Sequence, residues 1–335
     1  MRWEGLQVAG TGAWLPERVP CAQAVAEGLY GAAEYETNEI ESVCVAEGVS
    51  PPQMAVRAAG EALERAEQND LPPVSAVFHS HLGFQGAEMW SAAGHISHAV
   101  GAPGAPAYDL NQSCNGAMAG LELAAMTLER QGTGTALLTT ADRFALPAFD
   151  RWRSDSAAVY GDAGTALVLT TGRGFARLVC TVSGADSTLE AESRGAGFRE
   201  DPWGERPLDL DTRREDFLRG GPGLWEHYTR MGRTLSDVLG STLTEAGIDL
   251  VDVTWFVPVT ATYLNLKRMV KEILHVEESR TTWDFGRTVG HLGSGDQLAG
   301  LHHLAATGRL RSGDVVALVG GGSGYFCTCA VLEIL

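Results

Sequence analysis

Residues 119–140 read AGLELAAMTLERQGTGTALLTT, and residues 299–320 read AGLHHLAATGRLRSGDVVALVG. Each stretch begins with the same three residues, continues with apolar residues at helical spacing, breaks at a polar turn with glycine and ends in a short aliphatic run. The two stretches lie 180 residues apart. A second pair precedes them at nearly the same spacing, because residues 73–84 and 252–263 both resemble a buried strand that runs into a loop. Two pairs in the same order indicate an internal duplication.

The duplicated unit consists of a strand, a loop, a helix and a second strand, which predicts an α/β fold with pseudo-twofold symmetry. A chain of 335 residues exceeds what one hydrophobic core usually covers. A boundary between two halves is predicted after the aliphatic run at residues 166–170 and the glycine turn at 172–174. We therefore predict two halves, residues 1–175 and 176–335, each contributing a sheet covered by helices.

The composition excludes several classes of protein. A formal net charge of −17 argues against nucleic acid binding, which needs a concentrated basic surface. No apolar run approaches the roughly 18 residues of a membrane span, and no signal peptide pattern is present, so we expect a cytoplasmic protein without membrane contact. The six cysteines are scattered without CxxC spacing, which predicts reduced thiols and no metal site.

Cys114 is the candidate nucleophile. Small residues surround it in the sequence SCNGAMAG, where a helix is predicted to begin. At a helix N-terminus the backbone dipole and the free N–H groups favour a thiolate, which is the reactive form of cysteine. On these residues alone, Cys114 could equally be a small residue of the core.

Further short motifs occur in a fixed order along the chain. The set with Cys114 comprises residues 8–17 (VAGTGAWLPE), 113–116 (SCNG), 150–151 (DR) with 160–166 (YGDAGTA), 256–258 (FVP), and 320–322 (GGG) with Tyr325. This series resembles ketosynthase III type condensing enzymes of the thiolase superfamily, over most of the chain.

The resemblance implies a thiolase-like fold, in which two pseudo-symmetric halves form an αβαβα layered sandwich, and it implies a homodimer. The internal duplication agrees with such a fold. The resemblance also implies an oxyanion hole that consists of the backbone N–H groups of Cys114 and Gly321. The alternative for Gly321 is that the three glycines only allow tight packing.

Two departures from the family pattern bear on the reaction. Condensing members have a histidine after the Val-Pro dipeptide, where this chain has Val259. They also have an asparagine after a glycine, where this chain has His291. In the family these two residues hold the thioester carbonyl during decarboxylation and carbon–carbon bond formation. Valine cannot donate a hydrogen bond, so we expect decarboxylative condensation to be lost or badly weakened.

A cysteine, a histidine and a nearby aspartate suit acyl transfer instead. We expect His291 to act as base for Cys114 and Asp296 to orient its imidazole. This pattern resembles an acyltransferring subgroup of ketosynthase III homologues in antibiotic biosynthesis. Asp296 could alternatively cap a helix that begins at Gln297. The other candidates for the third residue are Asp142, Asp162 and Asp284.

The substrates are expected to be thioesters, and no permanently bound cofactor is predicted. The resemblance implies that coenzyme A is bound through a tryptophan and an arginine, which residues 35–42 lack, so the two alternatives for the donor are an acyl carrier protein and a coenzyme A thioester. Lys267, Arg268 and Lys271 lie where the family docks carrier proteins, although an ordinary solvated helix face would look the same. Residues 190–223, with Trp203, and residues 225–227 are the candidate walls of an acceptor pocket.

The predicted function is an acyltransferase of secondary metabolism, in polyketide or antibiotic biosynthesis. Cys114 would take an acyl group from the thioester and pass it to a hydroxyl, of a sugar or another natural-product scaffold, or to a carrier-protein thiol. One alternative is a decarboxylative starter enzyme of the ketosynthase III type. The other alternative is a partner subunit without catalytic activity, because duplicated folds often keep the scaffold and lose the chemistry.

Overall fold

The computed structural model describes residues 1–67, 70–195, 197–198, 200, 204 and 206–335. Its larger sheet contains β1 (Gln7–Trp14), β4 (Val74–Ser80), β5 (Ala107–Leu110), β6 (Thr135–Asp142), β7 (Ala163–Thr170), β8 (Ala176–Ala185), β9 (Trp255–Val257), β10 (Val315–Val319) and β11 (Phe326–Ile334). These strands are hydrogen-bonded in the order β5-β4-β6-β7-β1-β8-β11-β10-β9. A separate two-stranded sheet pairs β2 (Arg18–Pro20) with β3 (Ser42–Cys44).

The larger sheet repeats its pattern on either side of the contact between β1 and β8. In the first half β4 runs parallel to β6, and β7 and β1 follow in antiparallel order. In the second half β9 runs parallel to β10, and β11 and β8 follow in antiparallel order. This arrangement confirms the predicted α/β fold with two pseudo-symmetric halves. The proposed division after residue 175 falls in the turn between β7 and β8.

The two sheets expected from the sequence are joined into one. β1 and β8 pair at Gln7 with Arg177 and at Val8 with Ala176, which makes the nine strands a continuous hydrogen-bonded sheet. Because the join is two residue pairs long, the two halves can still fold over one another and enclose helices between them.

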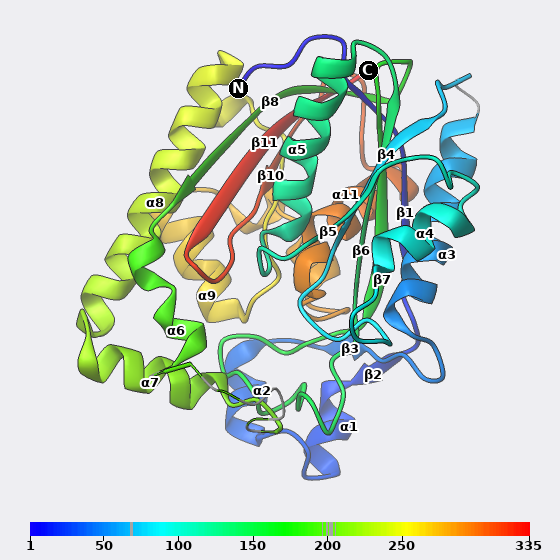
Figure 1. The fold of residues 1–335 in the computed structure, drawn as a ribbon. Helices are drawn as coiled ribbons and strands as arrows, with labels where there is room; N and C mark the ends of the chain where they lie inside the picture. Colours follow the sequence, from blue (N-terminus) through cyan, green and yellow to red (C-terminus); the bar gives the residue numbers. More distant parts are fainter. Residues whose placement is uncertain (68–69, 196, 199, 201–203, 205) are drawn as a thin grey trace.

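Helices cover both halves of the sheet and fill the space between them. The longer ones are α3 (Pro51–Ala66), α4 (Ala92–Ala99), α5 (Gly116–Gln131), α7 (Leu210–Gly220), α8 (Gly223–Ala246) and α11 (Asp296–Ala306), and the shorter ones are α1 (Cys21–Ala26), α2 (Ala32–Asn38), α6 (Ala191–Arg194), α9 (Tyr263–Lys267) and α10 (Trp283–Gly286). Packing follows the predicted five layers (Figure 1). α3 packs on β1, β6 and β7, and α8 packs on β8 and β11, while α5 and α11 lie between the two halves of the sheet. No helix among the described residues is long and apolar enough to cross a membrane.

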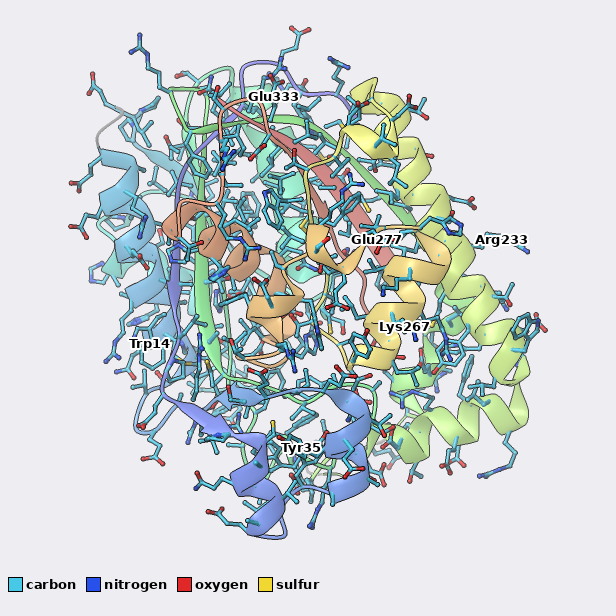
Figure 2. The ribbon with its side chains drawn as sticks, turned by 180° about the vertical axis from the view of Figure 1, so that it is seen from behind. Trp14, Tyr35, Arg233, Lys267, Glu277 and Glu333 are labelled. Atoms are coloured by element: carbon cyan, nitrogen blue, oxygen red, sulfur yellow. The ribbon has the colours of Figure 1, made fainter. Side chains whose placement is uncertain are left out.

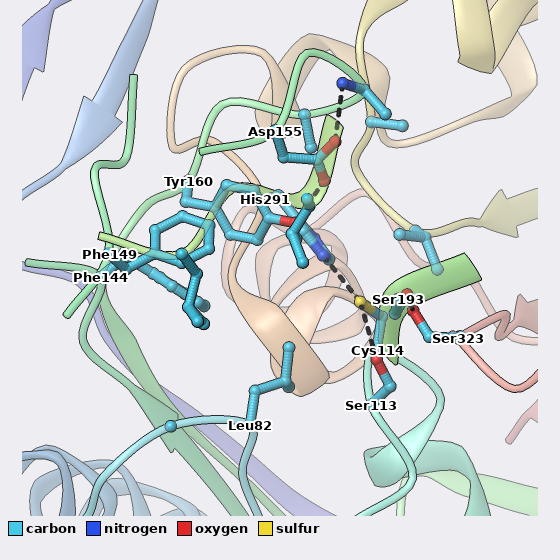
Figure 3. Close-up of a pocket in the computed structure, with 18 of the residues that line it drawn as sticks. Leu82, Ser113, Cys114, Phe144, Phe149, Asp155, Tyr160, Ser193, His291 and Ser323 are labelled. Atoms are coloured by element: carbon cyan, nitrogen blue, oxygen red, sulfur yellow. Dashed lines mark hydrogen bonds between the residues drawn. The ribbon is translucent and has the colours of Figure 1, made fainter. Parts of the chain in front are cut away.

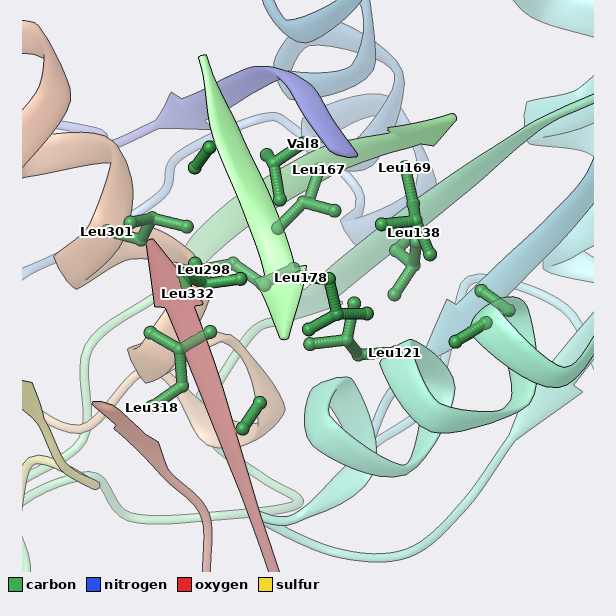
Figure 4. Close-up of a cluster of buried hydrophobic side chains, with 14 of the residues drawn as sticks. Val8, Leu121, Leu138, Leu167, Leu169, Leu178, Leu298, Leu301, Leu318 and Leu332 are labelled. Atoms are coloured by element: carbon green, nitrogen blue, oxygen red, sulfur yellow. The ribbon is translucent and has the colours of Figure 1, made fainter. Parts of the chain in front are cut away.

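The central core is made by α5 and α11 together with strands from both halves. Leu121 of α5 and Leu298 and Leu301 of α11 are fully buried there, and leucines of β6, β7, β8, β10 and β11 surround them (Figure 4). Burying each such leucine contributes about 1.5–3 kcal/mol. The two helices pack in the centre because the duplicated segment is apolar around most of its circumference, which agrees with the pattern at 119–140 and 299–320.

Residues 190–223 contain more regular structure than their composition suggests. α6 is one short turn, but α7 is an 11-residue helix that the sequence pattern did not predict. Its N-cap is Asp209, whose carboxylate accepts a hydrogen bond from the backbone N–H of Thr212. Trp203 lies outside the described residues. α7 packs on α6 and α8, so the segment is a helical cover for one end of the molecule.

Candidate active site

Cys114 lies in the tight turn that connects β5 to α5. α5 begins at Gly116, two residues after the cysteine, and Asn115 is its N-cap. The preceding residue, Ser113, has φ of +52°, a left-handed conformation that residues other than glycine rarely adopt. The side chain of Asn115 connects the turn to Thr328 of β11. Its Oδ1 accepts from the backbone N–H of Thr328 at 3.0 Å, and its Nδ2 donates to the Thr328 Oγ1 at 3.0 Å. The other five cysteines are buried, whereas Cys114 is partly accessible.

The three residues predicted as a catalytic set come together. The Sγ of Cys114 is 3.0 Å from the Nε2 of His291 (Figure 3). The Nδ1 of His291 is 2.6 Å from the Oδ2 of Asp296. His291 and Asp296 are almost completely buried. The imidazole therefore bridges the thiol and the carboxylate through its two ring nitrogens, which is the arrangement of a nucleophile, a base and an orienting acid.

Asp296 does not act as the helix cap that the sequence also allowed. α11 begins at Asp296 itself, with Gly295 at its N-cap. The carboxylate instead accepts backbone N–H bonds from Thr260 at 2.7 Å and from Leu292 at 2.8 Å, in addition to its bond with His291. These bonds fix the carboxylate between the loop after β9 and the turn before α11.

The three other candidate aspartates are engaged elsewhere. Asp142 accepts from the backbone N–H groups of Leu82 and Gly83. Asp162 forms a buried ion pair with Arg151, and Asp284 forms an ion pair with Arg309.

The electrostatics of the site favour a charged imidazole. Burial by itself lowers the pKa of His291, but the adjacent Cys114 and Asp296 outweigh it and raise this pKa well above its ordinary value. The effect is the one expected when an imidazole lies between a thiolate and a carboxylate. The geometry therefore suits a thiolate and imidazolium pair, which is the nucleophilic form of the cysteine.

His291 is supported by residues that the sequence did not identify. Its backbone forms a β-bridge with the segment that leads into β7, because the His291 N–H donates to the carbonyl of Val159 and the His291 carbonyl accepts from the N–H of Gly161. The ring of Tyr160 packs on the imidazole at 4.9 Å between centroids. The Tyr160 hydroxyl donates to Asp155 at 2.8 Å, so the ring is fixed at both ends. Tyr160 belongs to the YGDAGTA motif, but nothing in the motif signals a partner at Asp155.

The Cys114 and His291 side chains open onto a cavity of about 1250 Å³. An aromatic wall on one side consists of Phe144, Phe149 and Tyr160, whose ring centroids are 4.6 to 5.3 Å apart (Figure 3). Val259, which follows the Val-Pro dipeptide, lines the same cavity. Its side chain offers only van der Waals contact to a bound carbonyl group.

The prediction for residues 190–223 as a cavity wall agrees with the structure, but the prediction for residues 225–227 is wrong. Ser193 of α6 and Arg213 of α7 line the cavity. On α8 the lining residues begin only at Tyr228, while Trp225, one turn earlier, is 85% exposed and lies beyond the cavity.

The glycine loop, residues 320–322 between β10 and β11, packs against the turn that holds Cys114. A Cβ atom at Gly322 would lie 3.0 Å from the backbone nitrogen of Cys114 and 2.7 Å from that of Asn115, so a side chain does not fit there. Within the described ranges the backbone N–H groups of Cys114 and Gly321 donate to no protein acceptor. Both donors are therefore available to a ligand in the cavity, as an oxyanion hole requires.

The predicted basic segment lies beside the cavity. Lys267 ends α9, and Arg268 and Lys271 continue into a π-helical turn at Arg268–Ile273. Lys267 and Lys271 are exposed, and the Arg268 guanidinium lies 4.7 Å from the ring of Tyr228 and lines the cavity. In the part of the chain that the structure describes, no group of three or more His, Cys, Asp and Glu residues is arranged to hold a metal ion.

Comparison with known proteins agrees with this geometry. The family described as 3-oxoacyl-[acyl-carrier-protein (ACP)] synthase III matches residues 108–187, and its C-terminal domain matches residues 243–334. The solved structure of the acyltransferase ChlB3 is 34% identical and superposes with a TM-score of 0.91, covering 98% of each chain. The chain belongs to the ketosynthase III family. The resemblance drawn from the sequence motifs is thereby confirmed.

More distant members of the ketosynthase III family cover the whole chain as well. The acetoacetyl CoA synthase NphT7 of Streptomyces sp. strain CL190 is 26% identical, over 98% of both proteins. The structure of 3-oxoacyl-(acyl carrier protein) synthase III from Pseudomonas aeruginosa PAO1 is 21% identical, with a TM-score of 0.79 over 99% of this chain and 100% of that one, and shows the shared fold. The protein is thus a ketosynthase III enzyme, of a family that contains both condensing and acyl-transferring members.

Proposed function

We propose that this ketosynthase III enzyme is an acyltransferase that uses Cys114 as nucleophile, His291 as acid and base, and Asp296 as the residue that orients His291. The observation that carries the proposal is the linked geometry of the three side chains, at 3.0 Å and 2.6 Å, opposite an inert Val259. The 34% identity to ChlB3, which is described as an acyltransferase, supports it.

The first half of the reaction would acylate the enzyme. The Cys114 thiolate attacks the carbonyl carbon of the donor thioester, and the backbone N–H groups of Cys114 and Gly321 bind the oxyanion that forms. When the tetrahedral intermediate collapses, the carbon–sulfur bond to pantetheine breaks. The imidazolium of His291 then protonates the leaving thiolate, which leaves a neutral imidazole beside the acyl thioester.

The second half would transfer the acyl group to an acceptor hydroxyl or thiol. The neutral His291 removes the acceptor proton as the acceptor oxygen or sulfur attacks the acyl carbon. Collapse of the second intermediate breaks the bond to Cys114 and restores the thiolate and imidazolium pair. No carbanion forms in either half, so the missing donor at Val259 is not needed.

Donor recognition is proposed to involve an acyl carrier protein or coenzyme A, with no permanently bound cofactor. Lys267, Arg268 and Lys271 offer positive charge beside the cavity of an otherwise acidic protein. Arg233 of α8, which the sequence did not single out, is also exposed, and Figure 2 shows it on the same side of the molecule as Lys267. These residues are the proposed docking surface for an acidic carrier protein.

We also propose that the enzyme is a homodimer. β5 is an edge strand of the sheet, and Tyr108 on it is 48% exposed. Three further apolar side chains are exposed in the loop after β4, namely Phe84, Met89 and Trp90. An unpaired edge beside exposed apolar side chains is suited to pairing with a second copy. Light scattering after size-exclusion chromatography would report the mass expected for two chains, and a monomer at micromolar concentration would refute this part.

The test of the proposed function is intact-protein mass spectrometry after incubation with acyl-CoA and acyl carrier protein thioesters. The wild type should gain the mass of the acyl group, whereas Cys114→Ala should gain none and His291→Ala should gain it far more slowly. His98→Ala, an exposed histidine of α4, is the matched control and should behave as the wild type. Transfer of the bound acyl group to an added acceptor completes the test. A β-ketoacyl product from malonyl and acyl thioesters would instead establish a condensing enzyme, and absence of any mass gain would favour a partner subunit without catalytic activity.

A further inference from the structure

The lining of the cavity carries an excess of positive charge. Its described arginines and carboxylates are Arg143, Arg206, Arg213, Arg214, Arg268, Asp155 and Glu192. The protein as a whole has a formal net charge of −17, so the composition does not account for this concentration of cations. A cavity that gathers arginines in an acidic protein is complementary to an anionic ligand.

Arg214 does not contribute to the excess, because three carboxylates neutralise it. Its guanidinium is 2.7 Å from Asp155, 2.7 Å from Asp211 and 3.2 Å from Glu192. Both carboxylates of the cavity lining are therefore already engaged by this one arginine. Asp155 and Glu192 are therefore not free to neutralise another arginine of the cavity lining.

Arg213, the preceding residue, has a different environment. Its Nη1 donates to the backbone carbonyl of Ser193 at 2.9 Å, which is a neutral partner. No carboxylate of the described residues lies within 4 Å of its guanidinium. Asp209, one turn earlier, is close enough for Arg213 to help lower its pKa, but its two oxygens are held mainly by hydrogen bonds from Thr212. Most of the five N–H donors of Arg213 are thus available to a ligand.

Ser323 supplies a second donor beside this arginine. The Oγ of Ser193 donates to the Oγ of Ser323 at 2.7 Å (Figure 3). A hydroxyl that accepts in this way keeps its own hydrogen, for which the described residues provide no acceptor. Both serines line the cavity, and Ser323 directly follows the glycine loop with Gly321. Ser193 therefore links the guanidinium of Arg213 to the part of the cavity where the acyl group would react.

We propose that Arg213 and Ser323 form an anion subsite, which binds a carboxylate or phosphate carried by a substrate of the acyl transfer. The inference rests on the proposed function for the identity of the ligand, but the subsite can be tested without turnover. A guanidinium and a hydroxyl are the donors that bind carboxylate and phosphate oxygens well. Two sources would offer such a group: a carboxylate on the acyl chain, and the phosphate at the far end of the pantetheine arm.

Calorimetric titration of the Cys114→Ala protein distinguishes these sources. The ligands are amide analogues of butyryl-pantetheine and succinyl-pantetheine, each with and without the 4′-phosphate. A charge-assisted hydrogen bond should tighten binding of the matching anion about tenfold to a hundredfold over its neutral counterpart. A gain from succinyl over butyryl assigns the subsite to the acyl chain, and a gain from the phosphate assigns it to the arm.

Variants of α7 in the same background decide whether Arg213 is responsible. Arg213→Gln should abolish the anion preference, and Arg213→Lys should keep part of it because the charge remains. Arg219→Gln is the matched control, since Arg219 lies on the same helix, is 72% exposed and pairs with Asp216. An unchanged preference in Arg213→Gln would overturn the proposal. So would equal binding of neutral and anionic ligands, or no binding of any of them, in the parent protein.

A separate measurement distinguishes a failure of the anion subsite from a failure of the proposed acyltransferase function. Acylation of wild-type Cys114 by neutral butyryl-pantetheine, followed by mass spectrometry, reports the nucleophile alone. Acylation without anion preference would refute only the subsite. An anion preference that depends on Arg213, without acylation by any donor, would refute only the acyltransferase.

Discussion

The two halves of the molecule place different residues at equivalent positions around the same point. With the 180-residue offset, α5 and α11 begin at Gly116 and Asp296, and β6 and β10 begin at Thr135 and Val315. Cys114 then corresponds to Ser294, which is fully buried and donates to the carbonyl of Ser80. The first half therefore provides Cys114, the proposed nucleophile, and the second half provides His291 and Asp296.

Equivalent positions are not interchangeable, because their surroundings differ. A Cβ at Gly116 would lie 1.8 Å from the Oγ of Ser80 and 3.1 Å from its Cβ, so a side chain there would force Ser80 to move. In the second half the same position is Asp296, which has room for a carboxylate because Thr260 and Leu292 bind it. The duplication fixes where the two central helices begin, and the local packing decides which half can carry each functional group.

The largest effect should follow from replacing Cys114 with alanine, and the same replacement of the equivalent Ser294 is its comparison. Cys114→Ala should abolish covalent acylation, a loss of at least about a thousandfold, because no other thiol is adjacent to His291. Ser294→Ala should acylate within a few fold of the wild type and should lose about 1 kcal/mol of stability with its hydrogen bond to Ser80. Mass spectrometry gives the first quantity and urea unfolding the second. Loss of acylation in Ser294→Ala at full stability would show that the second half carries a nucleophile as well.

A smaller but still large effect should follow from Asp296→Asn. The amide cannot compensate a positive imidazolium, and it can stabilise the wrong tautomer of His291, so we expect acylation to slow by about a hundredfold to ten-thousandfold. The amide has only one oxygen, whereas Thr260 and Leu292 donate to different oxygens of Asp296, so the variant should lose one of these bonds and about 1 kcal/mol of stability with it. Single-turnover kinetics with an acyl-pantetheine thioester measures the rate. A rate within threefold of the wild type would mean that Asp296 only anchors the turn.

The pH dependence of Cys114 alkylation tests whether His291 accepts the proton of the Cys114 thiol. Burial alone would lower the pKa of His291, but Cys114 and Asp296 raise it well above its ordinary value, which favours the protonated imidazole. His291→Asn removes this proton acceptor. Alkylation by iodoacetamide should then fall about tenfold to a hundredfold at pH 7, and the deficit should shrink towards pH 9, where hydroxide removes the thiol proton. Equal profiles for the two proteins would contradict a thiolate and imidazolium pair.

Tyr160→Phe should have a moderate effect. The variant keeps the ring that packs on His291 but loses the hydrogen bond to Asp155, which leaves a buried carboxylate with one partner fewer. We expect the rate of acylation to fall about threefold to tenfold, with a loss of stability of about 1 kcal/mol. Kinetics and urea unfolding measure both. An unchanged rate in a less stable protein would mean that Tyr160 supports the fold but does not position His291.

The period at residues 119–140 and 299–320 predicted the two central helices and the duplicated α/β fold. The approach of His291 to Cys114 was predicted only through the resemblance to the ketosynthase III family, because the two residues lie far apart in the chain. The contacts of Tyr160 with Asp155, and of Arg213 with Ser193, join segments that carry no shared pattern. Trp225 was placed wrongly because composition does not reveal where along a helix the cavity begins.

The last expected effect is on stability and concerns two positions 180 residues apart, Asp142 at the end of β6 and Gly322 in the loop after β10. Burial raises the pKa of Asp142 to about 7, against backbone hydrogen bonds from Gly83, Leu82 and Ser294 and the nearby charge of His291, which lower it. Gly83 and Leu82 both donate to its Oδ1. The folded state therefore binds this proton more tightly than the unfolded state, so the contribution of Asp142 to stability is greatest below about pH 4 and is lost as the pH rises to about 7. Asp142→Asn removes this dependence while the amide oxygen still accepts both backbone bonds. Relative to the wild type, the variant should gain about 1–2 kcal/mol between pH 5 and pH 8 in urea unfolding. A constant difference between the two proteins would mean that Asp142 is ionised throughout this range, and that its buried charge is balanced by the imidazolium of His291.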